Sequence, residues 1–160
     1  MGGIVGYNEP GADGTSKVIG GDGAKKGVNA AHVIGKRRVG GIIGANPADG
    51  TISGWLNRGF VAAQEAYAGG IAGCNGDPEK SGTSGGNSAV IHNCSSEVVI
   101  SGSNDARQLV DSGLFRANYT GGIAGYNDGI IASDKKVSLV CNLTGGNFVG
   151  GVVGYNDVDA

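Results

Sequence analysis

The sequence predicts an all-β fold in which short parallel strands stack as the coils of a β-solenoid, also called a parallel β-helix. Three observations lead to this prediction: a heptapeptide that recurs five times, an interval of 29 residues that occurs twice between its copies, and short β-branched runs between them. The heptapeptide reads Gly-Gly-aliphatic-aliphatic/Ala-Gly-x-Asn, and its copies are residues 2–8, 40–46, 69–75, 121–127 and 150–156. We treat residues 1–160 as a single solenoid domain of about five coils, expected to be a segment of a longer chain.

The spacing of the heptapeptide defines the size of one coil. The copies begin at residues 2, 40, 69, 121 and 150, and two of the intervals are 29 residues long. We therefore expect a basic coil of roughly 29 residues, with loop insertions in the longer intervals. The interval of 38 residues is interpreted as one coil plus a loop. Residues 76–120, within the interval of 52, are interpreted as containing either a large insertion or a degenerate coil.

The segments between the heptapeptides favour strands over helices. A helical repeat would place several glycines inside helices, at a cost of about 1 kcal/mol each. Short β-branched runs bounded by Gly, Asn, Asp and Ser instead predict three strands per coil, counting the heptapeptide. Residues 60–67 have helical propensity but occupy a strand position in register, so we expect a strand there. Residues 104–110 are expected to form one capped helical turn in a loop.

Solenoid coils stack about 4.8 Å apart, so equivalent residues of successive coils lie directly over one another. The third heptapeptide residue is expected to form an aliphatic column that points into the core. This column contains Ile4, Ile42, Ile71, Ile123 and Val152. The fourth residue is expected to face the other way on its strand or to lie next to a corner.

Two further columns follow from the same repeat. The final Asn suits a turn, because Asn tolerates the left-handed region and forms hydrogen bonds along a ladder. This ladder contains Asn8, Asn46, Asn75, Asn127 and Asn156. Two residues before the Gly-Gly pair, Tyr67, Tyr119 and Phe148 form an aromatic column that Arg38 interrupts.

The sequence contains no convincing catalytic, cofactor-binding or metal-binding motif, so we expect no enzyme activity and no cofactor. Residues 82–86 fit the Gly-x-Ser-x-Gly pattern, but loop residues flank them where a nucleophile elbow requires a strand and a helix. His32 and His92 are far apart and lack a paired Glu or Cys motif, which argues against a metal site. No calcium loop, phosphate-binding loop or dinucleotide fingerprint is present.

Composition excludes several other classes. Glycine accounts for 34 of 160 residues without a collagen period, and 39% apolar residues argue against disorder. A net charge of -2 does not favour nucleic-acid binding. No apolar run is long enough to insert into a membrane, and no signal-peptide pattern occurs. The three cysteines, Cys74, Cys94 and Cys141, lack metal-site spacing and are interpreted as buried thiols.

The heptapeptide, followed by strand, turn, strand and the next copy, resembles the GLUG-motif repeat family of large bacterial surface and secreted proteins. The resemblance extends from residue 2 to residue 156. Residues 50–53, 91–95 and 99–102 partly match the stretches that this family favours between its motifs. The resemblance implies an extracellular, adhesin-like β-solenoid, and the family has no shared catalytic residues.

We therefore expect a non-catalytic structural or adhesive module of a bacterial cell-surface or secreted protein, a rigid rod that displays loops or stacks end to end. One alternative is an extracellular filament subunit that self-assembles by head-to-tail stacking of coils, because an uncapped solenoid end presents unpaired strand edges. A carbohydrate-active β-helix enzyme is a weaker alternative. The expected partners are flanking repeats of a parent chain, further copies of the same chain, or a host glycan or protein ligand.

Overall fold

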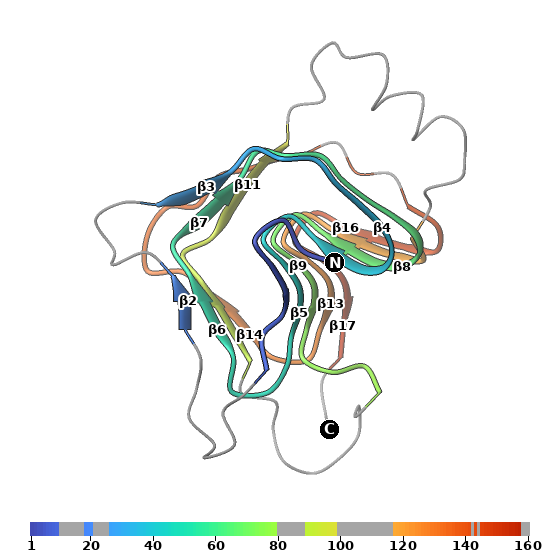
Figure 1. Ribbon diagram of the computed structural model, residues 1–160, viewed down its shortest axis with the longest axis horizontal. Helices are drawn as coiled ribbons and strands as arrows, with labels where there is room; N and C mark the ends of the chain where they lie inside the picture. Colours follow the sequence, from blue (N-terminus) through green and yellow to red (C-terminus); the bar gives the residue numbers. More distant parts are fainter. Residues whose placement is uncertain are drawn as a thin grey trace.

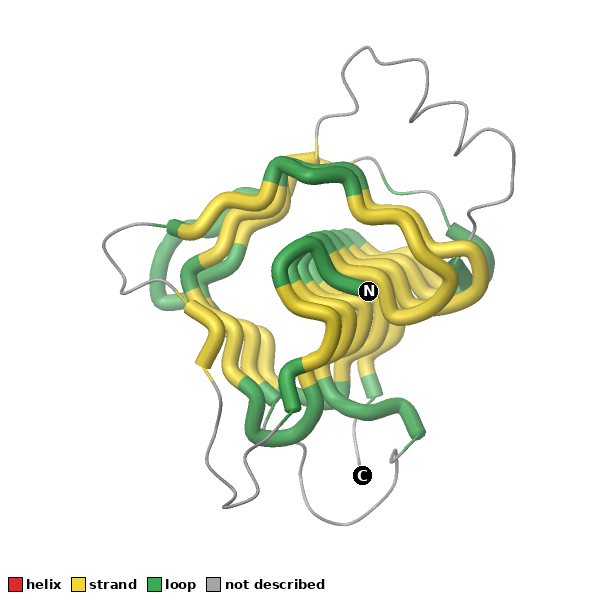
Figure 2. Tube along the Cα trace, viewed as in Figure 1, coloured by secondary structure: helices red, strands yellow, loops and turns green. Residues whose placement is uncertain are grey.

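The computed structural model describes residues 1–9, 18–20, 26–79, 89–98, 117–141, 143 and 145–157. These residues form strands joined by turns and loops and contain no helix, which confirms the all-β prediction (Figures 1 and 2). The strands are β1 (Val5–Tyr7), β2 (Val18–Gly20), β3 (Gly27–Asn29), β4 (Val33–Gly40), β5 (Ile43–Asn46), β6 (Thr51–Ser53), β7 (Trp55–Asn57), β8 (Val61–Gly69), β9 (Ala72–Asn75), β10 (Val90–His92), β11 (Ser95–Val98), β12 (Tyr119–Gly121), β13 (Ala124–Asn127), β14 (Ile130–Ala132), β15 (Leu139–Cys141), β16 (Phe148–Gly150) and β17 (Val153–Asn156).

The strands form four parallel sheets that the chain visits in rotation. The sheet of the heptapeptides has the order β1-β5-β9-β13-β17, and we call it the motif sheet. The other sheets have the orders β14-β10-β6-β2, β15-β11-β7-β3 and β16-β12-β8-β4. All neighbouring strands in these sheets run parallel. Figure 2 shows the successive passes of the chain lying behind one another.

Each pass contains four strands, so the prediction of three was wrong. The reason is a corner made by a single residue between β6 and β7, where Gly54 has φ 69°. Asn93 occupies the equivalent corner between β10 and β11, with φ 54°. A residue in the left-handed region turns the chain within one position, so a run that reads as one strand becomes two strands in different sheets.

The five heptapeptides lie in register across the motif sheet. Ile43 pairs with Ala72 and Ala124 pairs with Val153, so these neighbours are separated by 29 residues. Ala72 pairs with Ala124 across the long interval. Between β9 and β13 the described residues hold β10, β11 and β12, one strand for each of the other sheets. The extra length of this interval lies in the segments after β9 and after β11, which include residues 80–88 and 99–116 outside the described residues.

Residues 61–69 form strand β8, which confirms the strand expected there despite the helical propensity of residues 60–67. Pairing with β4 over almost the whole length of β8 outweighs the local preference. The helical turn expected at residues 104–110 lies outside the described residues.

Strands β4 and β8 run outward and then fold back toward the motif sheet (Figure 1). Their pairing shifts register between Gly35 and Arg37. Arg38 and the equivalent Tyr67 have φ 51° and 56°, an uncommon conformation for residues with a side chain. The fifth heptapeptide residue must be Gly here, because a Cβ at Gly73 would collide with the Arg38 backbone and one at Gly125 with the Tyr67 backbone.

The main hydrophobic core contains both the third and the fourth heptapeptide residues. Ile42, Ile43, Ile71 and Ala72 belong to one buried cluster, together with Ile52, Ile91, Cys94, Ile123 and Ala124. The expectation that the fourth residue faces away was therefore wrong, and its alternative holds. A bend at residues 41–42 turns the chain just before β5, so consecutive residues at this corner face the same core.

A smaller second cluster of Val33, Val39, Ala63, Ala68 and Ala117 fills the fold of β4 and β8. In the part of the chain that the structure describes, no helix has the length and apolar character needed to cross a membrane.

Candidate functional site

The final residues of the heptapeptides form a continuous hydrogen-bonded ladder, which we call the long asparagine column. Each side-chain Nδ2 donates to the Oδ1 of the next Asn, and all four bonds therefore run in one direction along the stack. The distances are 3.1 Å from Asn8 to Asn46, 2.8 Å from Asn46 to Asn75, 2.8 Å from Asn75 to Asn127 and 2.7 Å from Asn127 to Asn156.

The same side chains also close the turns that follow their strands. Asn46 Nδ2 donates to the Gly50 carbonyl at 3.0 Å, and Asn127 Nδ2 donates to the Gly129 carbonyl at 2.9 Å. None of the five ladder residues has a positive φ, so the left-handed conformation expected for them does not occur. Their role in the turn comes from the side-chain amide. Because it is both donor and acceptor, the amide joins neighbouring strands of the motif sheet and caps a turn at once.

The aliphatic column lies in register but has two different environments. Ile42, Ile71 and Ile123 are buried in the main core. Ile4 and Val152, at the two ends of the column, are 46% and 45% exposed. Each interior member packs between two neighbours, and each end member has a neighbour on one side within the described residues.

The structure brings Tyr67, Tyr119 and Phe148 together as a stack of nearly parallel rings, with centroids 5.0 and 5.1 Å apart. Arg38 occupies the next position of this column and pairs with Glu79 at 2.7 Å and with Asp77 at 3.6 Å. Ring faces inside the stack cover one another, so the outer face of Phe148 is the one that points toward a further layer.

A second aromatic column, which the sequence analysis missed, contains Tyr126 and Tyr155. Their rings stack at 6.1 Å, and Tyr126 also makes an edge contact with Tyr67 at 5.7 Å. Tyr155 contacts Tyr119 and Phe148 edge-on at 5.6 and 5.8 Å. The signal was present in the sequence, because the sixth heptapeptide residue is Tyr in the first, fourth and fifth copies.

A second, shorter asparagine column crosses the interior opposite the Gly-Gly pairs. Asn29 Nδ2 donates to Asn57 Oδ1 at 2.9 Å and to the Gly41 carbonyl at 2.8 Å. Both residues are buried. In the third pass Ser96 takes the equivalent place, and we call these three residues the short asparagine column. A Cβ at Gly41 would collide with Asn57, and one at Gly70 with Ser96, which explains the second Gly of the motif.

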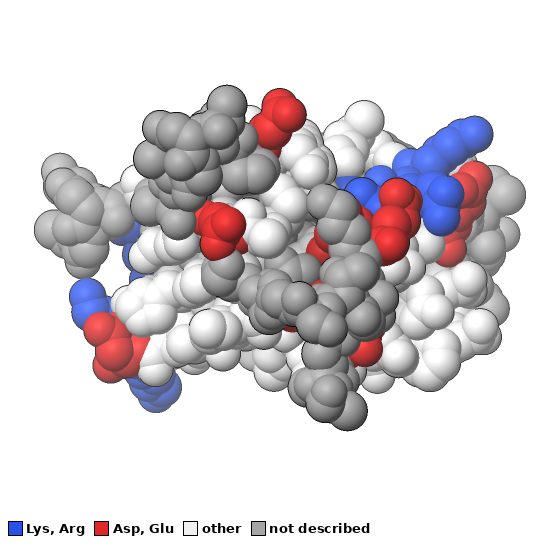
Figure 3. Space-filling view, turned by 90° about the horizontal axis from the view of Figure 1, so that it is seen from below, with Lys and Arg blue, Asp and Glu red and all other residues white. Residues whose placement is uncertain are grey.

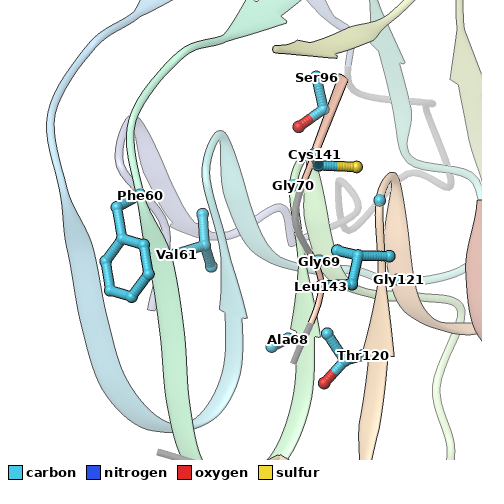
Figure 4. A pocket seen from close by; sticks show the side chains of 11 residues that line it. Phe60, Val61, Ala68, Gly69, Gly70, Ser96, Thr120, Gly121, Cys141 and Leu143 are labelled. Atoms are coloured by element: carbon cyan, nitrogen blue, oxygen red, sulfur yellow. The ribbon is translucent and has the colours of Figure 1, made fainter. Parts of the chain in front are cut away.

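A cavity of about 40 Å³ lies where the short column changes from Asn to Ser. Ser96, Thr120, Cys141 and Phe60 are among the residues that line it (Figure 4). Ser96 is fully buried, and its Oγ makes no hydrogen bond within the described part of the chain. A buried hydroxyl without a partner is costly, so this is a weak point of the stack.

The three cysteines are free thiols in separate environments. Cys74 and Cys94 are buried, and Cys141 is half-buried. Burial raises the pKa of the Cys74 thiol to about 12 and raises the pKa of the other two thiols as well. A raised pKa lowers the thiolate fraction and hence nucleophilicity, so none of them has the environment of a reactive cysteine.

The remaining candidate groups do not converge. His32 Nδ1 accepts a hydrogen bond from the Phe60 amide at 3.0 Å, and His92 lies 3.8 Å from a carboxylate oxygen of Asp134. The Gly-x-Ser-x-Gly match at residues 82–86 lies outside the described residues. Among the residues that the structure describes, no group of three or more His, Cys, Asp or Glu is placed to hold a metal ion.

Exposed large hydrophobic side chains are confined to the two ends of the stack. We call the first heptapeptide with β2, β3 and β4 the first layer, and β14, β15, β16 and the last heptapeptide the last layer. Apart from Met1, these side chains belong to Ile4, Tyr7, Val28 and Ile34 in the first layer and to Ile130, Val140, Phe148, Val149, Val152 and Tyr155 in the last layer. Within the described residues, none lies on the strands between these layers.

A cavity lies between the main core and the last layer. It has a volume of about 170 Å³ and is lined by Ile123, Ile131, Leu139, Val152 and neighbouring residues. On the face shown in Figure 3, uncharged side chains cover most of the described surface, and basic side chains gather near its two lateral margins.

Comparisons with protein-family models, with curated proteins and with solved structures find no match to this chain.

Proposed function

We propose that this chain is a non-catalytic structural and adhesive module of a bacterial cell-surface or secreted protein, in which stacked coils form a stiff rod that displays loops. The observation that carries the proposal is the in-register stacking of the five heptapeptides, with a continuous Asn ladder beside a continuous aliphatic core. Each pass is held mainly by the passes before and after it, which is the organisation of a repeat protein that works as a spacer.

The proposal includes a closed solenoid. Strands β1–β4, β5–β8, β9–β12 and β13–β16 would form four complete coils, and β17 would begin a fifth. With a spacing of about 4.8 Å, the motif sheet would be roughly 20 Å long between its outer strands. The resemblance to GLUG-motif repeats supports the extracellular location and the adhesin-like role.

Duplication of one coil tests the structural role. Residues 40–68 form one basic repeat, and a second copy inserted after residue 68 would continue all four sheets in register. We expect the extended chain to fold and its maximum dimension, measured by small-angle X-ray scattering, to increase by about 4.8 Å. A scrambled insert of the same composition is the control. Loss of folding with the true repeat, or turnover of members of a glycan panel by the unmodified chain, would contradict the proposal.

A second candidate function is a self-assembling filament subunit. In the part of the chain that the structure describes, the exposed large hydrophobic side chains lie in the first and last layers, which favours it.

A further inference from the structure

The first and last heptapeptides are nearly interchangeable. Residues 2–8 and 150–156 differ only at the third position, where Ile4 and Val152 differ by one methylene group. The other three copies differ from residues 2–8 by larger changes in side-chain size. The second copy has Ile43 and Ala45 in place of Val and Tyr, and the third has Ala72 and Cys74. The fourth has Ala124 in place of Val, a loss of two carbon atoms. The strands of the two outer copies, β1 and β17, form opposite edges of the motif sheet.

The strand count restricts how two copies of this chain can meet. Among the described residues, the motif sheet has five strands, and the other three sheets have four each. If β1 of one copy paired with β17 of another, only the motif sheets would join. A space one strand wide would then separate the edges of the other three sheets, leaving their backbone groups unpaired.

Strand exchange removes this mismatch. If β17 takes the place of β1 on β5 of the next copy, β14, β15 and β16 come into pairing distance of β2, β3 and β4 of that copy. One strand pair is replaced by an equivalent one, and three new strand pairs form. The exposed Val28 of β3, Ile34 of β4 and the exposed apolar side chains of the last layer are buried in the same step, whereas Ile4 and Tyr7 leave with the displaced first heptapeptide.

We propose that copies of this chain associate head to tail by strand exchange, with β17 of one copy replacing β1 on β5 of the next. This inference rests on the proposed structural role and names the partner of the first and last layers. Asn156 then takes the place of Asn8 as donor to Asn46, so the long asparagine column continues in the same direction through the joint. Phe148 comes to lie beside Arg38 of the next copy, where its open face accepts a cation–π contact.

The side-chain contacts of β1 and β17 determine which of these two strands is displaced in the exchange. Tyr155 of the last heptapeptide contacts Tyr119, Tyr126 and Phe148 of its own chain. Tyr7, at the equivalent place in the first heptapeptide, has no ring contact among the described residues and is 52% exposed. The last heptapeptide therefore keeps its place, and the first heptapeptide of the next copy is displaced.

Sedimentation velocity of two matched variants tests the exchange. Val5→Asp weakens β1 on its own β5, where Val5 packs against the main core, and so opens the site for β17 of another copy. Val153→Asp weakens the strand that must enter this site. We expect Val5→Asp to lower the midpoint concentration of association on the order of tenfold. We expect Val153→Asp to remain monomeric, and exposed Gln64→Asp on β8, which adds the same charge, to behave as the unmodified chain.

The two variants separate exchange from simple stacking of ends. Equal inhibition by Val5→Asp and Val153→Asp would overturn the exchange, because β1 would then be part of the joint. A monomeric Val5→Asp chain with an unchanged β-type circular dichroism spectrum would overturn it as well. If all chains stay monomeric but the coil duplication still lengthens the rod, the structural role stands and the self-association fails.

A peptide measurement covers the case in which Val5→Asp unfolds the chain. A fluorescent peptide of residues 147–157 should bind the unmodified chain and lower the mass of its assemblies. The same peptide carrying Val153→Asp should do neither. Identical behaviour of the two peptides would contradict the exchange.

Discussion

Both asparagine columns link neighbouring strands by side-chain hydrogen bonds, but the long column is continuous and the short column is interrupted. In the long column, five Asn side chains form four successive bonds, and Asn46, Asn75 and Asn127 also bond to nearby carbonyls. In the short column, Asn29 and Asn57 form one such bond, and the following Ser96 is too short to continue it. The cavity and the unpartnered hydroxyl occur at that point. A repeat position therefore stabilises the stack only while its side chain reaches its equivalent on the next strand of the sheet.

The largest effect is expected at the centre of the long column. Asn75→Ala removes the acceptor for Asn46 and the donor for Asn127 and Ala89, all in a fully buried place. We expect a loss of about 4 kcal/mol in the free energy of unfolding, because buried amides lose their partners. Urea denaturation measures it. Asn156→Ala, at the exposed end of the same column, should cost about 1 kcal/mol, and equal losses at both sites would argue against a cooperative ladder.

A smaller loss is expected in the short column. Asn57→Ala removes the acceptor for Asn29 and the bonds to Gly59, but Asn29 keeps its bond to the Gly41 carbonyl. We expect a destabilisation of about 2 kcal/mol in the same denaturation experiment. A loss as large as that of Asn75→Ala would show that the two columns contribute alike.

Ser96 allows the short column to be repaired. Ser96→Asn should fill the cavity and accept the bond that Asn57 is placed to donate, because Gly70 leaves the same room there that Gly41 leaves for Asn57. We expect a gain of about 1 kcal/mol. Ser96→Ala is the control, because it removes the unpartnered hydroxyl without adding a bond. The larger cavity that it leaves offsets the relief of the buried hydroxyl, so it should be nearly neutral. A destabilising Ser96→Asn alongside a neutral Ser96→Ala would contradict the proposed continuation of the column.

The cysteines next to the two columns should differ in alkaline solution. Cys74 precedes Asn75 of the long column, and its thiol has a pKa raised by burial from 9.0 to about 12. The unfolded chain therefore releases this proton at a lower pH than the folded chain. The thiol's contribution to stability is complete below pH 9 and is lost as the pH rises toward 12. Cys74→Ala should reduce this alkaline loss in pH-dependent urea melts, and an unchanged pH profile would argue against a buried, protonated thiol.

Thiol labelling of the native chain provides the matched comparison. Cys141 lies beside the cavity at the end of the short column and is the most exposed of the three cysteines. We expect it to react first with a thiol reagent at pH 8 and Cys74 to react last.

The sequence allowed the all-β class, the parallel stacking and the register of the heptapeptides to be predicted, because these depend on residues that recur almost unchanged. Four strands per pass were not predictable in the same way. Their corner is a single residue, Gly54 in one pass and Asn93 in another, with no shared identity. The short asparagine column was missed for a similar reason, since its third member is Ser96.

Local patterns also could not separate interior from end positions. Ile4 has the same residue type as Ile42 and Ile71, and Val152 is also β-branched and aliphatic, but Ile4 and Val152 lie in the outer layers, so their exposure depends on tertiary context. The second aromatic column was hidden because Ala45 and Cys74 interrupt it, although Tyr126 and Tyr155 follow the motif.

The most direct test of the in-register stack is a distance between the two ends of the motif sheet. Glu9 and Asp157 directly follow the first and last members of the long asparagine column. Nitroxide labels at Glu9→Cys and Asp157→Cys, in a chain whose three native cysteines are replaced by Ala, report this distance by pulsed electron paramagnetic resonance. Four strand spacings of about 4.8 Å predict a narrow distribution centred near roughly 20 Å. A broad distribution, or one centred beyond about 30 Å, would contradict the parallel, in-register stacking of the five heptapeptides.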